Sequence, residues 1–258
     1  MKIITLLSDL GQKDWYVGAM KGALLKAAPD AVVVDISHAV EPFEIVQAAL
    51  IARNVWTEYP EGTLHLLAVN CVYQSDPKFV VVRHSGHYFL APDNGLLSLV
   101  LGDIAPDAVR LLSNEAPGAH FAVKNVFAGA VKSCFDQVPF EQWGTDLPEP
   151  LLERISLHPV TTSAHIRGTV IYVDHFDNVI LNIDRPVFEK AAKGRSFSLF
   201  FKRNDPITEL SVNYCDVPVG EPLCLFNSAG LLEIAVNFGR AATLFGLKKD
   251  DVVELVFD

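Results

Sequence analysis

Strand-length apolar runs alternate with helix-like apolar stripes over the first part of the chain. The runs predict strands over 3–7, 31–36 and 63–69, the second of them buried, and a hairpin over 79–83 and 87–91. Three predicted helices carry their stripes at Val17, Met20, Leu24 and Ala28, at Ala48, Ala52, Val55 and Trp56 (from Pro42 onward), and at Phe127, Ala130, Val131, Cys134 and Phe135. Alternating strands and helices are typical of a mostly parallel, wound sheet, so we assign residues 1–148 to an α/β domain.

The pattern changes after the prolines at 148 and 150. We place a linker over 149–165, because its composition differs from that of both flanking regions. Beyond it, short apolar runs are separated by Gly, Pro, Asp and Asn and lie at 168–173, 179–183, 196–201, 222–226, 231–236 and 252–257. Short strands at such spacing predict an all-β, barrel-like domain over 166–258.

Composition narrows the classes of partner. The 258 residues are half hydrophobic and carry a net charge of −10 without any Lys/Arg run, so we expect no nucleic-acid partner. The four cysteines at 71, 134, 215 and 224 fit neither a zinc site nor a disulfide framework, and no other metal-ligand spacing is present. We read them as reduced and mostly buried thiols. With no signal peptide and no apolar run near the roughly 18 residues that span a bilayer, we expect a cytoplasmic protein with no membrane partner.

Several common catalytic motifs are missing from the chain. There is no G-x-G-x-x-G, no Walker loop, no G-x-S-x-G elbow and no H-E-x-x-H. His38 follows a predicted strand and is expected to be a hydrogen-bonded loop residue. The candidate binding and catalytic groups are therefore the polar residues at the ends of the predicted strands and helices.

Three loops concentrate such residues. Asp9 stands at the carboxyl end of the first predicted strand, where a carboxylate can accept two sugar hydroxyls or can simply cap the next turn or helix. The loop 173–178 places Phe176 beside acidic and amide side chains, which suits a stacked nucleobase or an ordinary turn with Asx hydrogen bonds. The loop 226–230 carries Asn227 and Ser228 and by itself predicts only a hairpin turn.

Taken in order, these segments resemble one family. The matching stretches are 7–11 (LSDLG), 17–22 (VGAMKG), 34–38 (VDISH), 91–97 (APDNGLL), 174–179 (DHFDNV) and 227–237 (NSAGLLEIAVN). The chain resembles the S-adenosyl-L-methionine (SAM) hydroxide adenosyltransferases, which are SAM hydrolases related to the SAM-dependent fluorinase and chlorinase. The resemblance implies an α/β N-terminal domain, a β-barrel-like C-terminal domain and no cofactor, since SAM is the substrate. It also implies a homotrimer in which the N-terminal domain of one subunit and the C-terminal domain of its neighbour hold the nucleoside.

The resemblance implies a role for each matched position. Asp9 would bind the ribose hydroxyls and Phe43 would flank the ligand. Asp174 would meet the methionine amine and Ser228 its carboxylate, while Asn178 and Tyr214 would hold adenine. The predicted substrate-binding residues are Asp9, Phe43, Asp174, Phe176, Asn178, Tyr214, Asn227 and Ser228.

Three positions depart from the family pattern. The hydrolases carry an aspartate after the third strand, an arginine a few residues later and a histidine before the third helix, which are thought to position and activate water. Here these positions read Asn70, Pro77 and Ala122, so the predicted catalytic positions are degenerate. At the methionine end, Ala229 replaces a larger residue. Three functions therefore remain: cleavage of SAM by water to adenosine and L-methionine, nucleoside binding without turnover, and action on a different nucleoside.

Overall fold

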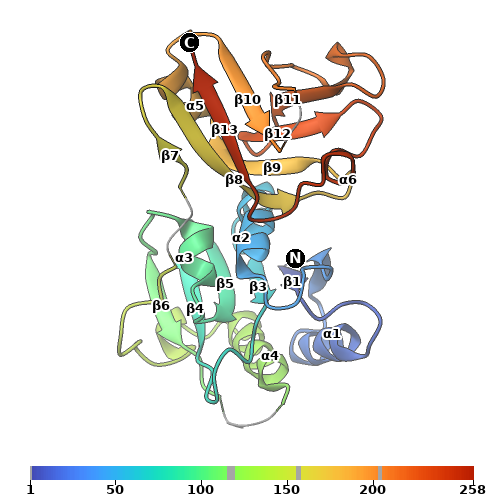
Figure 1. Ribbon diagram of the computed structural model, residues 1–258. Helices are drawn as coiled ribbons and strands as arrows, with labels where there is room; N and C mark the ends of the chain where they lie inside the picture. Colours follow the sequence, from blue (N-terminus) through green and yellow to red (C-terminus); the bar gives the residue numbers. More distant parts are fainter. Residues whose placement is uncertain (1, 115–119, 155–157, 203–204) are drawn as a thin grey trace. The chain divides into compact units, whose positions relative to one another are not determined.

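The computed structural model describes residues 2–114, 120–154, 158–202 and 205–258 (Figure 1). The chain divides into two compact units, Met1–Ile155 and Ser156–Asp258. The point of division lies inside the stretch 149–165 that the composition marks as a linker. Each unit is built around its own sheet.

The N-terminal unit contains a six-stranded sheet in the order β2-β1-β3-β5-β4-β6. Strands β2, β1, β3 and β5 are parallel, whereas β4 pairs antiparallel with both β5 and β6. The strands are β1 (Ile3–Ser8), β2 (Val32–Ser37), β3 (Leu64–Ala68), β4 (Phe79–His84), β5 (His87–Pro92) and β6 (Ala108–Leu111). The predicted α/β class with a mostly parallel sheet is confirmed.

Helices cover both faces of this sheet. One hydrophobic cluster joins α1 and α4 to the face that carries Leu6 and Leu66, and a second joins α2 and α3 to the face that carries Leu7 and Leu67. Successive residues of a strand point to opposite faces, so the continuous apolar runs of β1 and β3 supply both clusters. The helices are α1 (Tyr16–Ala27), α2 (Ile45–Arg53), α3 (Leu96–Leu101) and α4 (Ala122–Phe135), with short 3-10 turns η1 (Trp56–Glu58) and η2 (Phe140–Gln142).

Three details differ from the sequence-based expectations. Strand β2 is not buried, because it lies at the edge of the sheet and its burial alternates between half-buried and exposed. Helix α2 begins only at Ile45, since Phe43 has a φ of 71° that no right-handed helix accommodates, and it ends before Trp56. Helix α3 and strand β6 are not predicted. The hairpin predicted over 79–83 and 87–91 is confirmed, and its turn residues Ser85 and Gly86 both have positive φ, as a type I′ turn requires.

A group of buried histidines lies within the N-terminal unit. The Nδ1 atom of His65 lies 2.8 Å from Thr5 Oγ1, and its Nε2 atom lies 3.0 Å from Nδ1 of His87. Burial, together with the charge of His87, lowers the pKa of His65 to about 3. The ring of Trp56 packs edge-on against both His84 and His87, with centroids 5.9 and 5.1 Å away. These histidines are therefore part of the packed interior, and burial lowers the pKa of both His65 and His87, which keeps these two neutral at pH 7.

The C-terminal unit is a seven-stranded antiparallel sheet in the order β10-β13-β8-β9-β12-β11, with β7 paired to β8. One large hydrophobic cluster fills its interior, and a small second cluster consists of Leu223, Leu225 and Ala235. Its elements are β7 (Val160–Thr161), β8 (His165–Val173), β9 (Val179–Asp184), α5 (Arg185–Ala192), β10 (Phe197–Phe201), η3 (Tyr214–Asp216), β11 (Pro222–Phe226), β12 (Leu231–Val236), α6 (Ala241–Phe245) and β13 (Val252–Phe257). All six predicted strands are present. Helix α5, which is not predicted, begins where Asp184 accepts a hydrogen bond from Val187 N.

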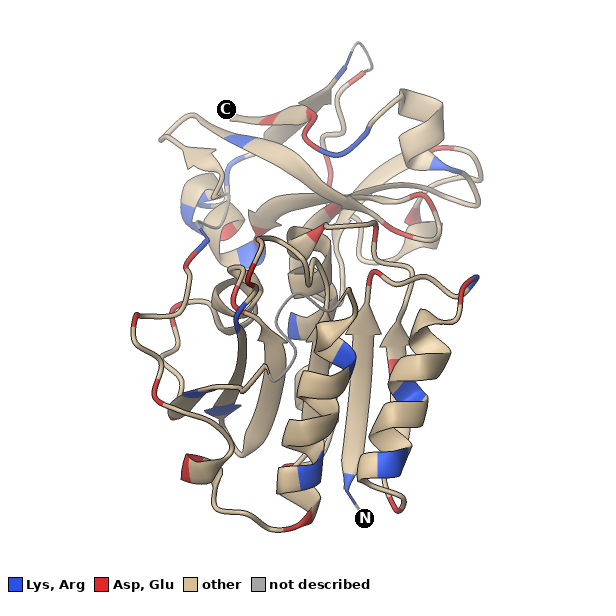
Figure 2. Ribbon diagram, turned by 90° about the horizontal axis from the view of Figure 1, so that it is seen from below, with Lys and Arg blue, Asp and Glu red and all other residues tan. Residues whose placement is uncertain are grey.

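The basic surface residues and the cysteines do not alter this description of the fold. In the described part of the chain, the basic residues of α1 and α4 stand singly along these helices (Figure 2). The four cysteines are free; Cys134 and Cys224 are buried and Cys215 is exposed. No helix among the described residues has the length and apolar character needed to cross a bilayer.

Candidate functional site

Asp9 lies at the carboxyl end of β1 and ties two loops together. Its Oδ2 atom accepts hydrogen bonds from the main-chain N–H of Phe43, at 2.9 Å, and of Asn70, at 3.0 Å. Its Oδ1 atom has no partner among the described residues. Helix α1 is preceded by Trp15 and has no side-chain cap, so the interpretation of Asp9 as a helix cap is wrong. The carboxylate instead shapes the rim of the sheet and retains one oxygen with free acceptor capacity.

Both loops adopt unusual main-chain conformations where they meet Asp9. Asn70 has a φ of 51°, which asparagine tolerates, whereas the φ of 71° at Phe43 is strained for an aromatic residue. The Phe43 side chain is 62% exposed. Asn94, buried at the start of α3, donates from Nδ2 to Val69 O and Asn70 O at 3.0 and 3.2 Å. The loop at Asn70 is thus held from two sides, and Phe43 is held open to solvent.

A polar chain joins the ends of β1 and β2 beside Asp9. Ser8 Oγ lies 2.7 Å from His38 Nδ1, and His38 Nε2 lies 3.1 Å from Asp35 Oδ1. Lys21 Nζ donates to the other oxygen of Asp35 at 2.6 Å. Burial alone would raise the pKa of Asp35, but the hydrogen bond from Lys21 and the nearby His38 imidazole outweigh it and lower the pKa. The expectation that His38 is a hydrogen-bonded loop residue is confirmed.

The degenerate catalytic positions Asn70 and Ala122 lie at this same end of the sheet. The ring of Tyr16, which opens α1 just after the Asp9 loop, packs edge-on against Phe121 with centroids 5.4 Å apart. Ala122 is the next residue, is buried as the first residue of α4, and borders a cavity of about 580 Å3. Asn70 is bonded to Asp9 through its main-chain amide, whereas Ala122 lies at the start of α4, and neither side chain can take a proton from water.

The third degenerate position, Pro77, lies in the loop between β3 and β4. Tyr73 Oη accepts a hydrogen bond from Lys78 N at 3.2 Å in this loop. The Lys78 ammonium, the cation next to Pro77, lies 3.7 Å from a carboxylate oxygen of Glu149. The Glu149 side chain is 78% exposed and that of Lys78 is 40% exposed, so this ion pair contributes little to stability and leaves part of the ammonium accessible.

In the C-terminal unit, Asp174 organises the turn between β8 and β9. Its Oδ1 atom accepts from Phe176 N at 2.9 Å and Asn178 N at 2.8 Å, and its Oδ2 atom accepts from Asn178 Nδ2 at 3.2 Å. Asp177 has a φ of 69° and holds the start of α6 through Thr243 N. The turn with Asx hydrogen bonds is therefore present, and Phe176 stands 72% exposed at its tip.

Glu233, in strand β12, is the centre of a second polar group. Its Oε1 atom accepts from Tyr214 Oη at 2.8 Å and its Oε2 atom from Asn227 Nδ2 at 3.1 Å. Burial and the charge of Asp174 raise the pKa of Glu233, while these two hydrogen bonds oppose the shift. Burial and the hydrogen bond to Glu233 also raise the pKa of Tyr214. The phenol is therefore a donor at neutral pH.

The turn 227–231 is held by its first residue. Asn227 Oδ1 accepts from Ala229 N at 3.0 Å and Leu231 N at 3.2 Å, which is the hairpin turn that the sequence predicts. Ser228 is exposed at the tip, and its side chain makes no hydrogen bond within the described part of the chain. Its hydroxyl is therefore free to meet a ligand.

Glu233 is the site residue that sequence reasoning missed. It is a single carboxylate inside the apolar strand LLEIAV, and it is only 2% exposed. A buried carboxylate needs hydrogen-bond partners. An acidic residue inside an apolar predicted strand was therefore the feature of the sequence that could have identified Glu233.

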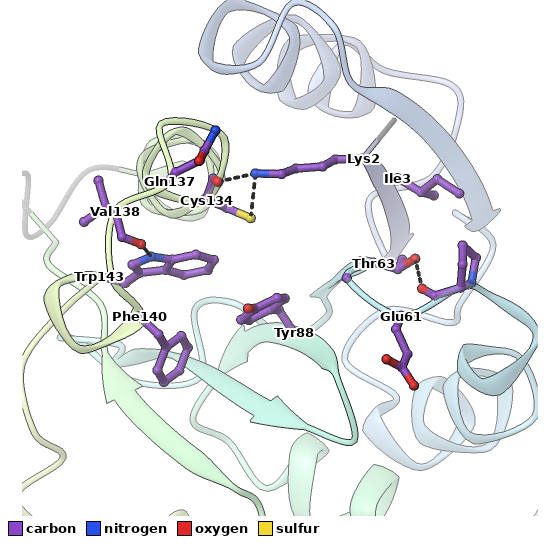
Figure 3. Close-up of a pocket in the computed structure, with 12 residues that line it drawn as sticks. Lys2, Ile3, Glu61, Thr63, Tyr88, Cys134, Gln137, Val138, Phe140 and Trp143 are labelled. Carbon is purple, nitrogen blue, oxygen red and sulfur yellow. Dashed lines mark hydrogen bonds between the residues drawn. The ribbon is translucent and has the colours of Figure 1, made fainter.

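A separate cavity lies at the amino ends of the parallel strands, away from Asp9 (Figure 3). It measures about 300 Å3, and its wall includes the stacked rings of Tyr88 and Trp143, with centroids 5.0 Å apart. Lys2 Nζ donates there to the carbonyl of Cys134 and so satisfies the end of α4. The described residues that line this cavity include none of the predicted site residues, so it is not part of the predicted site.

Comparison with known proteins identifies the family. Residues 4–144 match the SAM hydroxide adenosyltransferase N-terminal domain and residues 168–254 the corresponding C-terminal domain. A Thermus thermophilus protein named (R)-S-adenosyl-L-methionine hydrolase is 31% identical over 99% of this chain and 100% of its own length. A fluorinase from Actinopolyspora mzabensis is 26% identical over 96% of this chain and 94% of its own length.

Solved structures agree with the sequence matches. An uncharacterized conserved protein from Thermotoga maritima has a TM-score of 0.86 and 29% identity, over 99% of this chain and 100% of that one. A conserved hypothetical protein from Thermus thermophilus has a TM-score of 0.78 and 31% identity, with the same coverage. The chain described here belongs to the SAM hydroxide adenosyltransferase family.

Proposed function

We propose that the protein binds SAM and cleaves the bond between its sulfonium sulfur and ribose C5′ with water, releasing adenosine, L-methionine and a proton. The observation that carries this proposal is the arrangement of Asp9. Its Oδ2 atom is satisfied by two main-chain amides, and its Oδ1 atom is left with acceptor capacity at the carboxyl end of β1. Ligands of open α/β sheets bind at this place, and a ribose diol supplies two hydroxyl donors.

The reaction makes modest demands on the protein. Methionine leaves as a neutral thioether from a charged sulfonium, so the leaving group needs no acid. The site must hold a water in line with the C5′–S bond and remove competing solvent. A small anion in place of water would give a 5′-substituted adenosine by the same geometry.

The remaining predicted residues have matching chemistry. The exposed ring of Tyr214, held by Glu233, offers a flat face for adenine. The carboxylate of Asp174 supplies an opposite charge for the methionine ammonium, and the free hydroxyl of Ser228 can donate to its carboxylate. We propose a cytoplasmic homotrimer that needs no cofactor, on the strength of the family membership. Analytical ultracentrifugation tests the trimer.

Turnover is tested by incubating pure protein with SAM in isotope-labelled water. We expect adenosine and L-methionine in equal amounts, with the label in the 5′-hydroxyl of adenosine, as separated by chromatography and mass spectrometry. The Asp9→Ala variant is the control for adventitious activity. Unchanged SAM at saturating protein, or label in another position, would contradict the proposal.

Binding without turnover is the second candidate, and the residues at the degenerate positions favour it. Asn70 and Ala122 lie at the correct end of the sheet but cannot act as bases. A combined Asn70→Asp and Ala122→His change restores both groups. Aspartate tolerates the φ of 51° at position 70, and the cavity beside Ala122 gives an imidazole room.

If the protein only binds SAM, the double variant should hydrolyse it at least about tenfold faster than the unmodified protein, since a positioned base contributes about a hundredfold or more. Each single variant serves as a control. Calorimetry shows whether the unmodified protein binds SAM. No gain in a variant that still binds SAM would exclude a missing base as the reason for inactivity.

A further inference from the structure

Glu233 occupies an interior strand of the C-terminal sheet. Strand β12 pairs with β9 on one side and β11 on the other, and Glu233 lies opposite Ile180 and Leu225. Its neighbours in the strand are apolar and buried. A leucine or isoleucine would suit this environment, so the carboxylate is there at a cost in desolvation.

The two partners of Glu233 come from different elements. Tyr214 belongs to η3, nineteen residues before Glu233, and Asn227 belongs to the turn that joins β11 to β12. The tyrosine is 46% exposed, so its hydroxyl could bond to water without this carboxylate. The bond to Glu233 therefore fixes the direction of an otherwise mobile ring rather than rescuing a buried donor.

Asn227 transmits the effect to the turn. Its Nδ2 atom donates to Glu233, so its Oδ1 atom must face Ala229 N and Leu231 N. The carboxylate thereby sets the orientation of the amide, and the amide shapes the turn that presents Ser228.

We propose that Glu233 is a positioning residue that holds both ends of the substrate site at once, the aromatic face for the base through Tyr214 and the amino-acid end through Asn227 and Ser228. The inference rests on the proposed function, because it takes the ligand to be an adenosyl amino acid. Glu233 itself touches no reacting atom. It couples two contacts that would otherwise vary independently.

The test measures separately how each end of the ligand contributes to binding. Adenosine carries only the nucleoside end. S-adenosyl-L-homocysteine carries both ends but is a thioether and lacks the sulfonium leaving group. Calorimetry gives the dissociation constant of each ligand for the unmodified protein and for Glu233→Leu. The Glu254→Leu variant, at an exposed position of β13, is the matched control.

We expect Glu233→Leu to weaken adenosine about tenfold and S-adenosyl-L-homocysteine about a hundredfold, since each lost hydrogen bond to a carboxylate is worth about a factor of ten or more. The unfolding temperature should not fall, because a buried charge is replaced by an apolar side chain of similar volume. A merely structural role would instead lower the unfolding temperature and leave affinities alone.

Two further variants each remove one side of the coupling. Tyr214→Phe keeps the ring and should weaken both ligands by the same factor, about tenfold. Asn227→Ser keeps a hydroxyl acceptor for the turn amides but is too short to donate to Glu233, and should weaken only S-adenosyl-L-homocysteine. These variants decide the question if Glu233→Leu does not fold.

Equal affinities for Glu233→Leu, Glu254→Leu and the unmodified protein would overturn the inference and leave the proposed function standing. Equal losses for both ligands in Glu233→Leu would also overturn it, since the amino-acid end would then be independent. If the unmodified protein binds neither ligand, both the proposed function and this inference are wrong.

Discussion

Asp9 and Glu233 are carboxylates that organise the candidate sites of the two units in different ways. Asp9 is partly exposed and accepts main-chain amides from two loops, whereas Glu233 is buried and accepts side-chain donors from two elements. A hydrogen bond from a main-chain N–H does not depend on the side chain of the donating residue. The loop can therefore keep its shape with Asn70 in place of the family's aspartate. A side-chain bond depends on residue identity, so the site around Glu233 requires its tyrosine and its asparagine.

The largest expected effect comes from removing Asp9. Asp9→Ala should cost about 2 to 3 kcal/mol in adenosine binding, because a charged acceptor and the two loops it holds are lost together. It should also speed hydrogen exchange at the amides of Phe43 and Asn70. Calorimetry and exchange mass spectrometry measure these effects, with Asp14→Ala as the exposed control. Normal exchange at both amides would show that Asp9 does not shape the loops.

Acidification should change the stability of the two units in opposite directions. The folded pKa of His65, about 3, lies below the unfolded value of 6.5, so the unfolded state binds more protons as the pH falls below 6.5. Stability should fall by about 1 to 2 kcal/mol between pH 7 and pH 5. Denaturant unfolding measures this, and His65→Gln should flatten the dependence. An equal slope in that variant would assign the acid sensitivity to other groups.

Glu233 should respond with the opposite sign. Its folded pKa is raised, so protonation in acid removes a penalty that folding carries at pH 7, and this contribution becomes more favourable as the pH falls through the folded pKa. Amide exchange in β3 and β12, corrected for intrinsic rates at pH 7 and pH 5, compares the two. We expect protection in β3 to decrease relative to β12. An equal decrease of amide protection in β3 and β12 would contradict this prediction.

The smallest expected effect concerns the strained main chain beside Asp9. At position 43 the φ of 71° favours glycine, so Phe43→Gly should be more stable than Phe43→Ala by about 1 kcal/mol. Both variants lose the same exposed ring, so the difference isolates the backbone. Chemical denaturation measures it. Equal stability would mean that the conformation relaxes once the aromatic ring is gone.

Apolar patterning predicted most elements because their burial is regular. In the C-terminal unit the predicted runs 222–226, 231–236 and 252–257 coincide with β11, β12 and β13, since each is bounded by turn residues. Helix α3 is not predicted because nearly all of its residues are buried, so its sequence shows no helical period of apolar and polar residues. The four residues of β6 are too few for a pattern.

The candidate site was predictable only in part. Asp9 could be singled out from its place after an apolar run, but its bond to Asn70 spans 61 residues and depends on how β1 and β3 align. The role of Glu233 likewise depends on where η3 lies relative to β12. The sequence-based resemblance supplied residue types for the ligand contacts, whereas the residues that orient them emerge only from tertiary pairing.

The packing of Trp56 against His84 and His87 has a practical consequence for spectroscopy. All three tryptophans of the chain, Trp15, Trp56 and Trp143, precede residue 150, so indole emission reports on the N-terminal unit alone. A protonated imidazole quenches a neighbouring indole, so the emission of Trp56 should report on the charge of His87. Its emission, followed during an acid titration, reads out proton uptake in the interior without any added label.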